Sequence, residues 1–179
     1  MLWSSAGWHV RIIHPPPPTP KYKSTWDVEV VLNHLERLGS CELLDDTQLS
    51  HKLAMLLAIT TAGRASELQG LSLDYMADRG SNISFSLAKL TKTCRPGKKC
   101  KEIIIHEFTD RPRLDPVKCL RQYILRTVGW RQTEKQHSLL LGIVAPHNPV
   151  ATSTISNWLK KLMRAAGIDV SQYQGHSTR

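Results

Sequence analysis

The stretch LAMLLAITTAGRASEL, Leu53 to Leu68, decides the fold. Its first half is apolar almost all round, which predicts a central buried helix over roughly residues 46–62. Gly63 breaks this helix, and helical character resumes for about two turns in RASELQGL. The sequence therefore predicts a helical core with a corner at Arg64.

The spacing of apolar residues predicts two helices on either side of this core. The first covers residues 25–38, with Ser24 or Thr25 as its N-cap. The second begins at the Asp115-Pro116 pair, a typical N-cap and first-turn combination, and should end near Gly129.

A last helix is predicted over residues 152–166, capped by Thr152 or Ser153 and stopped at Gly167. Its apolar positions recur at helical spacing and face the core. Its other face carries polar and basic side chains: Ser156, Asn157, Lys160, Lys161 and Arg164.

Between Leu73 and Glu107 the pattern becomes typical of strands. The segments NISFSL and KEIII flank a basic connection whose Pro96-Gly97 pair is a strong turn signal. A hairpin or a three-stranded antiparallel sheet fits here. The predicted fold class is α+β, mainly helical with this small antiparallel sheet. Farther along, SLLLGIV fits either a short strand or a buried connector.

Length and composition predict one globular domain without a membrane span. Residues 1–23 contain a proline run and indicate a linker or tail, so the domain covers residues 24–179. A net charge of +9 favours a polyanionic partner, although a basic and inert surface explains the charge equally well. The four cysteines show no CxxC pair, which indicates reduced thiols of an intracellular protein and no metal site.

Three groups of residues are suited to phosphate chemistry. Arg64 follows the helix break, and Glu67 could brace it by a charge-assisted bond, although an isolated RxxE pair is more often a surface salt bridge. The second group is a hairpin connection with six cations and no acid, and a bound phosphate would relieve the repulsion between these cations. They are Lys89, Lys92, Arg95, Lys98, Lys99 and Lys101. The third is the terminal GHSTR, with His176 and Arg179.

Taken together, these residues could act on a phosphodiester without a metal. Arginine forks match non-bridging oxygens, so Arg64 and Arg179 could stabilise a five-coordinate transition state. Lys92 could donate a proton to the leaving 5′ oxygen, and His176 could accept a proton or donate a hydrogen bond.

Five stretches, in this order and spacing, resemble the catalytic domain of a tyrosine recombinase of the phage integrase family, and most of all the recombinases of DIRS-type retrotransposons. They are STWDVEVVLNHL, KLAMLLAITTAGRASELQGLSL, LTKTCRPGKKCKEI, PVKCLRQYI and ISNWLKKLMRAAGIDVSQYQGHSTR, which together cover residues 24–179. The resemblance implies a DNA breaking and rejoining core.

The resemblance also implies roles for single residues. It makes Arg64, Lys92, His176 and Arg179 catalytic, with Glu67 as the acidic companion of the first arginine. It places the helix 152–166 in the major groove, so that its polar face contacts DNA. The implied DNA contacts are Lys89, Arg95, Lys98, Lys99, Asn157, Lys160, Lys161 and Arg164.

In this family a tyrosine hydroxyl attacks the scissile phosphate and forms a 3′ phosphotyrosine, so no cofactor is needed. The implied partner is double-stranded DNA, with self-association on DNA in the full-length parent and no membrane or small-molecule cofactor. The implied location is intracellular, in the nucleus if the host is eukaryotic.

The sequence departs from the family pattern at the nucleophile, which lies beyond the HxxR box in family members. Tyr173 precedes the box, and Tyr22, Tyr75 and Tyr123 are not credible nucleophiles. The expectation is therefore a fragment that lacks the C-terminal part of the domain and binds DNA without catalysis. An RNA-binding or purely structural helical protein is a further alternative, although it leaves the ordered motifs unexplained.

Overall fold

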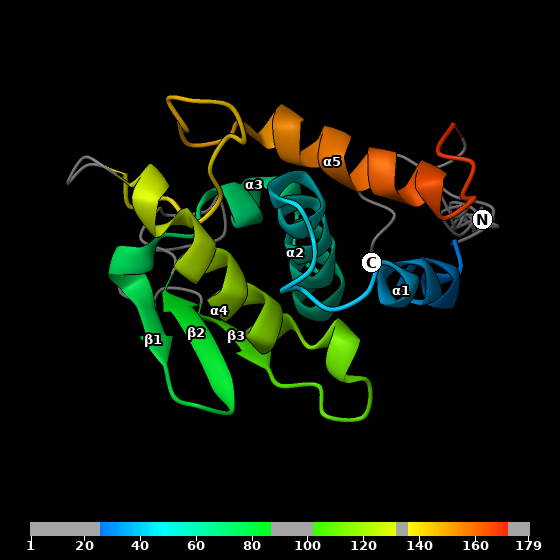
Figure 1. Ribbon diagram of the computed structural model, residues 1–179, viewed down its shortest axis with the longest axis horizontal. Helices are drawn as coiled ribbons and strands as arrows, with labels where there is room; N and C mark the ends of the chain where they lie inside the picture. Colours follow the sequence, from blue (N-terminus) through cyan, green and yellow to red (C-terminus); the bar gives the residue numbers. More distant parts are fainter. Residues whose placement is uncertain (1–25, 87–101, 132–135, 172–179) are drawn as a thin grey trace, which may run out of the picture.

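The central element of the fold is α2, Asp46–Thr61, around which the other helices and a small sheet are arranged (Figure 1). The structure is a computed structural model that describes residues 26–86, 102–131 and 136–171. Every residue of α2 from Leu49 to Ala58 is buried. The helices α3, Ala65–Gln69, α4, Pro116–Thr127, and α5, Thr152–Ala165, pack against it. The prediction of a central buried helix is confirmed.

The helix starts show which caps the sequence predicted correctly. Asp115 caps α4 as expected, and its Oδ1 accepts hydrogen bonds from the backbone N–H groups of Val117 at 2.8 Å and Lys118 at 3.2 Å. The first helix, α1, covers Val28–Arg37, and its N-cap is Asp27. The expected caps Ser24 and Thr25 were wrong, because the side chain of Asp27 accepts a hydrogen bond from the backbone N–H of Glu29 in the first turn.

The start of α5 also differs from the sequence prediction. Its N-cap is Ala151, which has no side-chain oxygen, and the helix has no side-chain cap. Thr152 and Ser153 were wrong as caps, because both already belong to the helix or its first turn. The free N–H groups of this helix end therefore lack the usual side-chain acceptor.

The sheet has three antiparallel strands in the order β1-β2-β3: Met76–Asp78, Asn82–Ser86 and Glu102–His106. Ile83 pairs with Ile105 and Phe85 with Ile103, and all four side chains are buried. The strand β3 packs against α2 and α4. The predicted α+β class with a small antiparallel sheet is confirmed.

Three short 3-10 helices join these elements: η1, Leu73–Tyr75, η2, Pro112–Leu114, and η3, Val128–Trp130. The segment SLLLGIV is a connector with buried leucines and not a strand. Leu139, Leu140 and Leu141 are buried, and only single bridges, Ser72 with Ser138 and Leu141 with Pro149, pair backbone there.

Two arginines fix loops onto helices over long sequence separations. The guanidinium of Arg111 reaches α1, where it lies 2.6 Å from Glu29 and 2.7 Å from Glu36. Arg126 of α4 donates to the carbonyl oxygens of Glu42, at 2.9 Å, and Leu44 in the loop between α1 and α2. These bonds attach the segment around Arg111 to α1, and the loop between α1 and α2 to α4. None of the described helices is long and apolar enough to cross a membrane.

Candidate functional site

Arg64 lies at a sharp corner between α2 and α3. The last residue before the corner, Ala62, has a left-handed backbone with φ 47°, and the N–H of Gly63 donates to Ala58 O at 3.2 Å. Arg64 then takes an extended conformation as the N-cap of α3. The helix break predicted from the sequence therefore places this arginine where its side chain leaves the core.

The carboxylate of Glu67 fixes the backbone of this corner. Its Oε2 accepts a hydrogen bond from the backbone N–H of Arg64 at 2.9 Å. The sequence predicted contact between these two residues, and the contact that the structure gives is to the backbone N–H. Glu67 thus positions the residue that carries the guanidinium.

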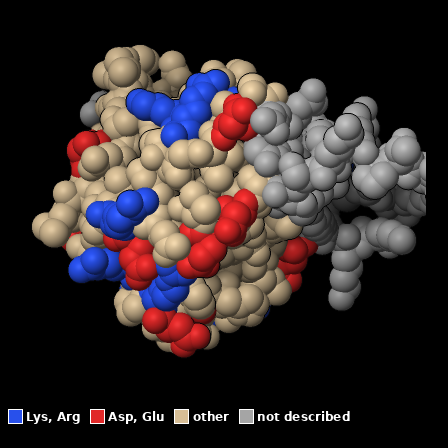
Figure 2. Space-filling view, turned by 90° about the vertical axis from the view of Figure 1, so that its right-hand side faces the viewer, with Lys and Arg blue, Asp and Glu red and all other residues tan. Residues whose placement is uncertain are grey.

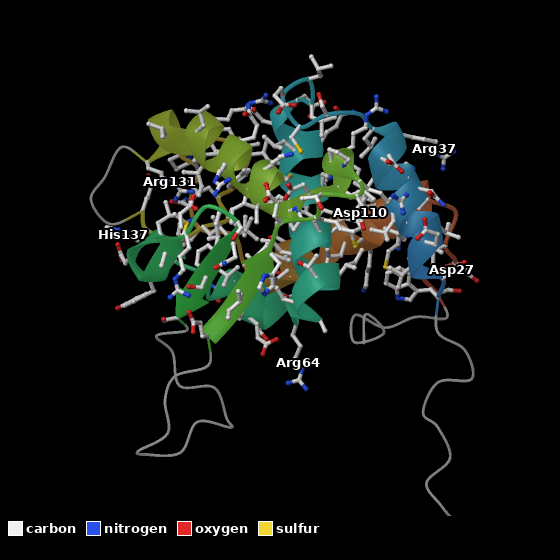
Figure 3. All side chains as sticks on the ribbon, turned by 90° about the horizontal axis from the view of Figure 1, so that it is seen from below. Asp27, Arg37, Arg64, Asp110, Arg131 and His137 are labelled. Carbon is white, nitrogen blue, oxygen red and sulfur yellow. The ribbon has the colours of Figure 1, made fainter. Side chains whose placement is uncertain are left out.

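The guanidinium of Arg64 is exposed and projects away from the body of the domain (Figure 3). Within the described part of the chain no carboxylate forms an ion pair with it. An exposed guanidinium without an acidic partner among these residues can bind a phosphate through two parallel hydrogen bonds, in bidentate geometry.

The helix α5 adjoins this corner, because it packs against both α2 and α3. Its core side is apolar, with Ile155, Trp158 and Leu162 buried. The Trp158 ring lies against the His51 imidazole of α2, with 5.2 Å between ring centroids. This contact fixes how α5 is rotated about its axis.

The opposite side of α5 carries the polar residues that the sequence predicted. Asn157, Lys161 and Arg164 are exposed and Lys160 is half-buried. These positions are three or four residues apart, so they form one stripe along the helix. We call these four residues the α5 stripe. Its three cations form no ion pair with an acid of the described residues.

Several other cations of the described ranges, exposed or half-buried, are neutralised by acids. Arg79, Arg111, Lys118, Arg121 and Arg126 each form an ion pair. Figure 2 shows a face of the molecule on which Lys and Arg alternate with Asp and Glu. Such a mixed face is a poor match for a phosphate backbone. Exposed Arg37 and Arg113 also lack an ion pair among the described residues, but only the α5 stripe and Arg64 lie on the adjoining elements α5 and α3.

The sequence did not predict a role for His51. Its ring contacts Trp158 on the core side of α5, opposite the α5 stripe. Burial, together with the nearby charge of Lys161, lowers the pKa of the His51 imidazole. The only signal in the sequence is a single histidine next to the apolar run of α2. That signal does not distinguish a helix contact from any other core histidine.

Several predicted site residues lie outside the described residues. They are Lys89, Lys92, Arg95, Lys98, Lys99, His176 and Arg179. The strands on either side of residues 87–101 are described, and Ser86 at the end of β2 pairs with Glu102 at the start of β3. Among the described residues, no three His, Cys, Asp or Glu side chains lie together as a metal site requires.

Comparison with known proteins adds a family and a fold. The model of the phage integrase family matches residues 27–179. A solved structure, described as that of XerA recombinase, superposes with a TM-score of 0.55 at 21% sequence identity. The match covers 92% of this chain and 50% of that chain, so this chain spans about half the length of the recombinase.

No curated protein matches the chain. At 21% identity the XerA likeness shows the fold alone, a mixed helical domain with a small antiparallel sheet. The family model covers far more than half of the chain. This chain therefore belongs to the phage integrase family, the tyrosine recombinases.

Proposed function

We propose that the chain is the DNA-handling part of an enzyme that breaks and rejoins DNA at specific sites. The observation that carries this proposal is the family match over residues 27–179, combined with an exposed Arg64 that has no ion pair among the described residues and begins the helix packed against α5. The bound partner is double-stranded DNA, with phosphates contacted by Arg64 and the cations of the stripe.

In this proposal α5 enters the major groove, which is wide enough for one helix. Lys160, Lys161 and Arg164 bind phosphates, whereas the amide of Asn157 is suited to a base edge. Lys89, Arg95, Lys98 and Lys99 add phosphate contacts. The DNA site is then recognised by one helix face and held by charge around it.

The proposed chemistry is transfer of a DNA strand to a tyrosine and back. Arg64 and Arg179 stabilise the added negative charge on the scissile phosphate, while Lys92 protonates the leaving 5′ oxygen. His176 assists by accepting a proton or donating a hydrogen bond. Glu67 acts as a positioning residue through its bond to the backbone N–H of Arg64.

A second candidate function, DNA binding without catalysis, is favoured by the two tyrosines that the structure describes. Tyr123 is buried, its hydroxyl accepts a hydrogen bond from Leu141 N at 3.0 Å, and burial raises its pKa. Tyr75 belongs to η1 beside the sheet. A buried and hydrogen-bonded hydroxyl such as that of Tyr123 is not available to attack a phosphate, which favours binding without catalysis by this residue.

The resemblance to DIRS-type recombinases leads us to propose a transposable element as the source of the gene. Self-association on DNA and a location in the nucleus of a eukaryotic host belong to the same proposal. Self-association is expected because two DNA strands must be exchanged between neighbouring active sites, and the nuclear location is expected because the DNA of a eukaryotic host lies there.

DNA binding is tested by measuring the affinity for a labelled duplex over a range of salt concentrations. We expect log K to fall linearly with log salt, and each of Lys160→Ala, Lys161→Ala and Arg164→Ala to reduce the slope by about one. The matched control is Arg113→Ala, an exposed arginine of η2 without an ion pair among the described residues. The control should leave the slope unchanged.

A salt slope that none of the α5 substitutions alters would overturn the proposal and favour a structural protein. Equal affinity for double-stranded RNA would favour the RNA-binding alternative. Catalysis is tested separately with a nicked DNA substrate that traps a covalent adduct. An adduct formed by this chain alone would rule out the non-catalytic alternative, and its loss in Arg64→Ala would place Arg64 in the reaction.

A further inference from the structure

Two buried cysteines from distant parts of the chain, Cys41 and Cys119, belong to the same core cluster. Cys41 lies in the loop between α1 and α2 and is 7% exposed, whereas Cys119 of α4 is completely buried. Both are free thiols. The proposed DNA chemistry uses neither of them.

Arg126 fixes the loop onto the face of α4 that carries Cys119. It donates to Glu42 O at 2.9 Å and to Leu44 O, within three residues of Cys41. Cys119 precedes Arg126 by seven residues, which is about two helical turns, so both side chains lie on one face of α4. The loop therefore runs along that face.

Lys52 of α2 fixes the other end of the loop. Its side chain is completely buried, and its Nζ donates to Gly39 O at 2.7 Å, two residues before Cys41. Because α2 packs against α4, the two anchors hold the loop between these helices. Cys41 and Cys119 belong to the same buried cluster there, and each thiol shifts the pKa of the other.

The surroundings make the two thiols unequal. The interaction with Cys119 lowers the pKa of Cys41 against the effect of burial, and the charge of Lys52 acts in the same direction. The same interaction, with burial, raises the pKa of Cys119 well above its usual range. Since the thiolate is the nucleophile, Cys41 is the more reactive of the two.

We propose that Cys41 and Cys119 form a reversible redox site, at which a peroxide links the α1–α2 loop to α4 through a disulfide. The Cys41 thiolate attacks one peroxide oxygen, the O–O bond breaks, and the leaving hydroxide takes up a proton as water. The Cys119 sulfur then attacks the resulting sulfenic acid, and the S–O bond breaks. The thiol proton of Cys119 leaves with the hydroxide as a second water, so two thiols lose two electrons and the peroxide gains them.

The expected consequence is a more stable and less mobile core. The disulfide closes a long loop that contains α2, α3, Arg64 and the sheet, which restricts the unfolded chain. We expect the melting temperature of the oxidised chain to rise by several degrees. A thiol reductant should reverse the rise.

The test uses the complete chain with Cys94→Ser and Cys100→Ser, so that only one pair of thiols remains. After treatment with hydrogen peroxide, we expect both thiols to disappear in a thiol titration. Non-reducing peptide mass spectrometry should show the Cys41 and Cys119 peptides joined, with the loss of two hydrogens. Dithiothreitol should restore both thiols and the original melting temperature.

Two variants separate the roles of the side chains. Cys119→Ser should leave a sulfenic acid on Cys41 that a dimedone probe captures, and Lys52→Met should slow the reaction several-fold and move its pH profile upward. In wild type the same linked peptide should be found, so the proposal does not depend on the folding of any variant.

Three results would overturn the proposal. The first is two unreacted thiols at peroxide concentrations that oxidise the unfolded chain. The second is oxidation of Cys41 without a link to Cys119, and the third is a link only between separate chains. The outcome is independent of DNA binding, so failure of the proposed function would leave it unchanged.

Discussion

Gly63 is the residue on which the corner beside Arg64 depends. A Cβ atom at this position would lie 2.6 Å from the hydroxyl oxygen of Thr61. That hydroxyl donates to Leu57 O at 2.6 Å, so it is not free to move without losing a hydrogen bond. Only a residue without a side chain fits between α2 and α3 here.

We expect Gly63→Ala to lower the free energy of unfolding by about 1–3 kcal/mol, because the added methyl group overpacks the corner. Urea unfolding measures the change. Gly129→Ala is the matched control, since no atom lies within 4 Å of the Cβ that it would add. Equal effects of the two substitutions would show that the close approach at Gly63 carries no energetic weight.

At the scale of the secondary-structure elements, α5 lacks the N-terminal cap that the other long helices have. Ala151 holds the N-cap position in an extended conformation, with φ −76° and ψ 157°. A serine there can accept a hydrogen bond from a free N–H group of the first turn. We expect Ala151→Ser to raise the free energy of unfolding by about 0.5–1 kcal/mol.

The measurement is again urea unfolding, with Ala165→Ser at the exposed C-terminal end of α5 as control. The control tests whether serine itself matters, and it should be neutral or slightly destabilising because serine is a weaker helix former than alanine. A stabilising effect of both substitutions would contradict the capping explanation.

An ion pair between Asp78 and Arg121 attaches the strand β1 to α4. Asp78 lies 2.7 Å from an Arg121 guanidinium nitrogen, and the N–H of Gly80 donates to the same carboxylate at 2.9 Å. These hydrogen bonds, first that from Arg121, lower the pKa of Asp78 from 3.8 to about 2. The folded state therefore holds the charged carboxylate more strongly than the unfolded state does.

Because the folded pKa is the lower one, the stabilisation from Asp78 is present above pH 3.8 and is lost as the pH falls toward about 2. We expect Asp78→Asn to remove this part of the acid sensitivity. The check is a series of unfolding measurements from pH 5 to pH 2, with Asp110→Asn as control, an exposed aspartate without an ion pair among the described residues. Parallel curves for wild type and Asp78→Asn would contradict the assignment.

The elements that could be predicted from the sequence are those with a local signal. The apolar run of α2, the break at Gly63 and the Asp115 cap of α4 are all encoded within a few residues. The cap of α1 was wrong because several polar residues stand near its start, and the cap of α5 was wrong because Ala151, which has no side-chain acceptor, holds the N-cap position. The anchors Arg111 and Arg126 join residues 75 to 84 positions apart, for which no local pattern exists.

The same distinction applies to the candidate site. The sequence predicted Arg64 from the helix break and the α5 stripe from helical spacing, and the structure places both on adjoining elements. The support of α5 by His51 was not predictable, because it depends on how two helices cross. The roles of Lys92, His176 and Arg179 stay predictions, since these residues lie outside the described ranges.

At the scale of the whole molecule, charge is distributed unevenly. The described residues contain 13 Lys and Arg and 14 Asp and Glu, whereas the whole chain has a net charge of +9. The excess positive charge therefore belongs to the remaining segments of the sequence. On a nearly neutral body, unpaired cations such as those of the α5 stripe offer DNA an attractive surface with little competing field.

The packing of α5 onto α2 makes the stability of the whole molecule sensitive to pH. His51 is buried against Trp158 at this contact, where the charges of Lys161 and Asp45 act on it. Burial and the charge of Lys161 lower the pKa of His51 from 6.5, against the opposite effect of Asp45. Below pH 6.5 the unfolded chain therefore takes up a proton that the folded chain resists.

We expect the free energy of unfolding to be highest above pH 6.5 and to fall as the pH drops through that value. His51→Phe keeps an aromatic ring against Trp158 and removes the titrating group, so its unfolding should depend less on pH between 8 and 5. His34→Asn is the comparison variant, because burial also lowers the pKa of His34, which lies in α1. If His51→Phe keeps the full pH dependence and His34→Asn loses it, the acid sensitivity arises in α1 and the α2–α5 contact is not its source.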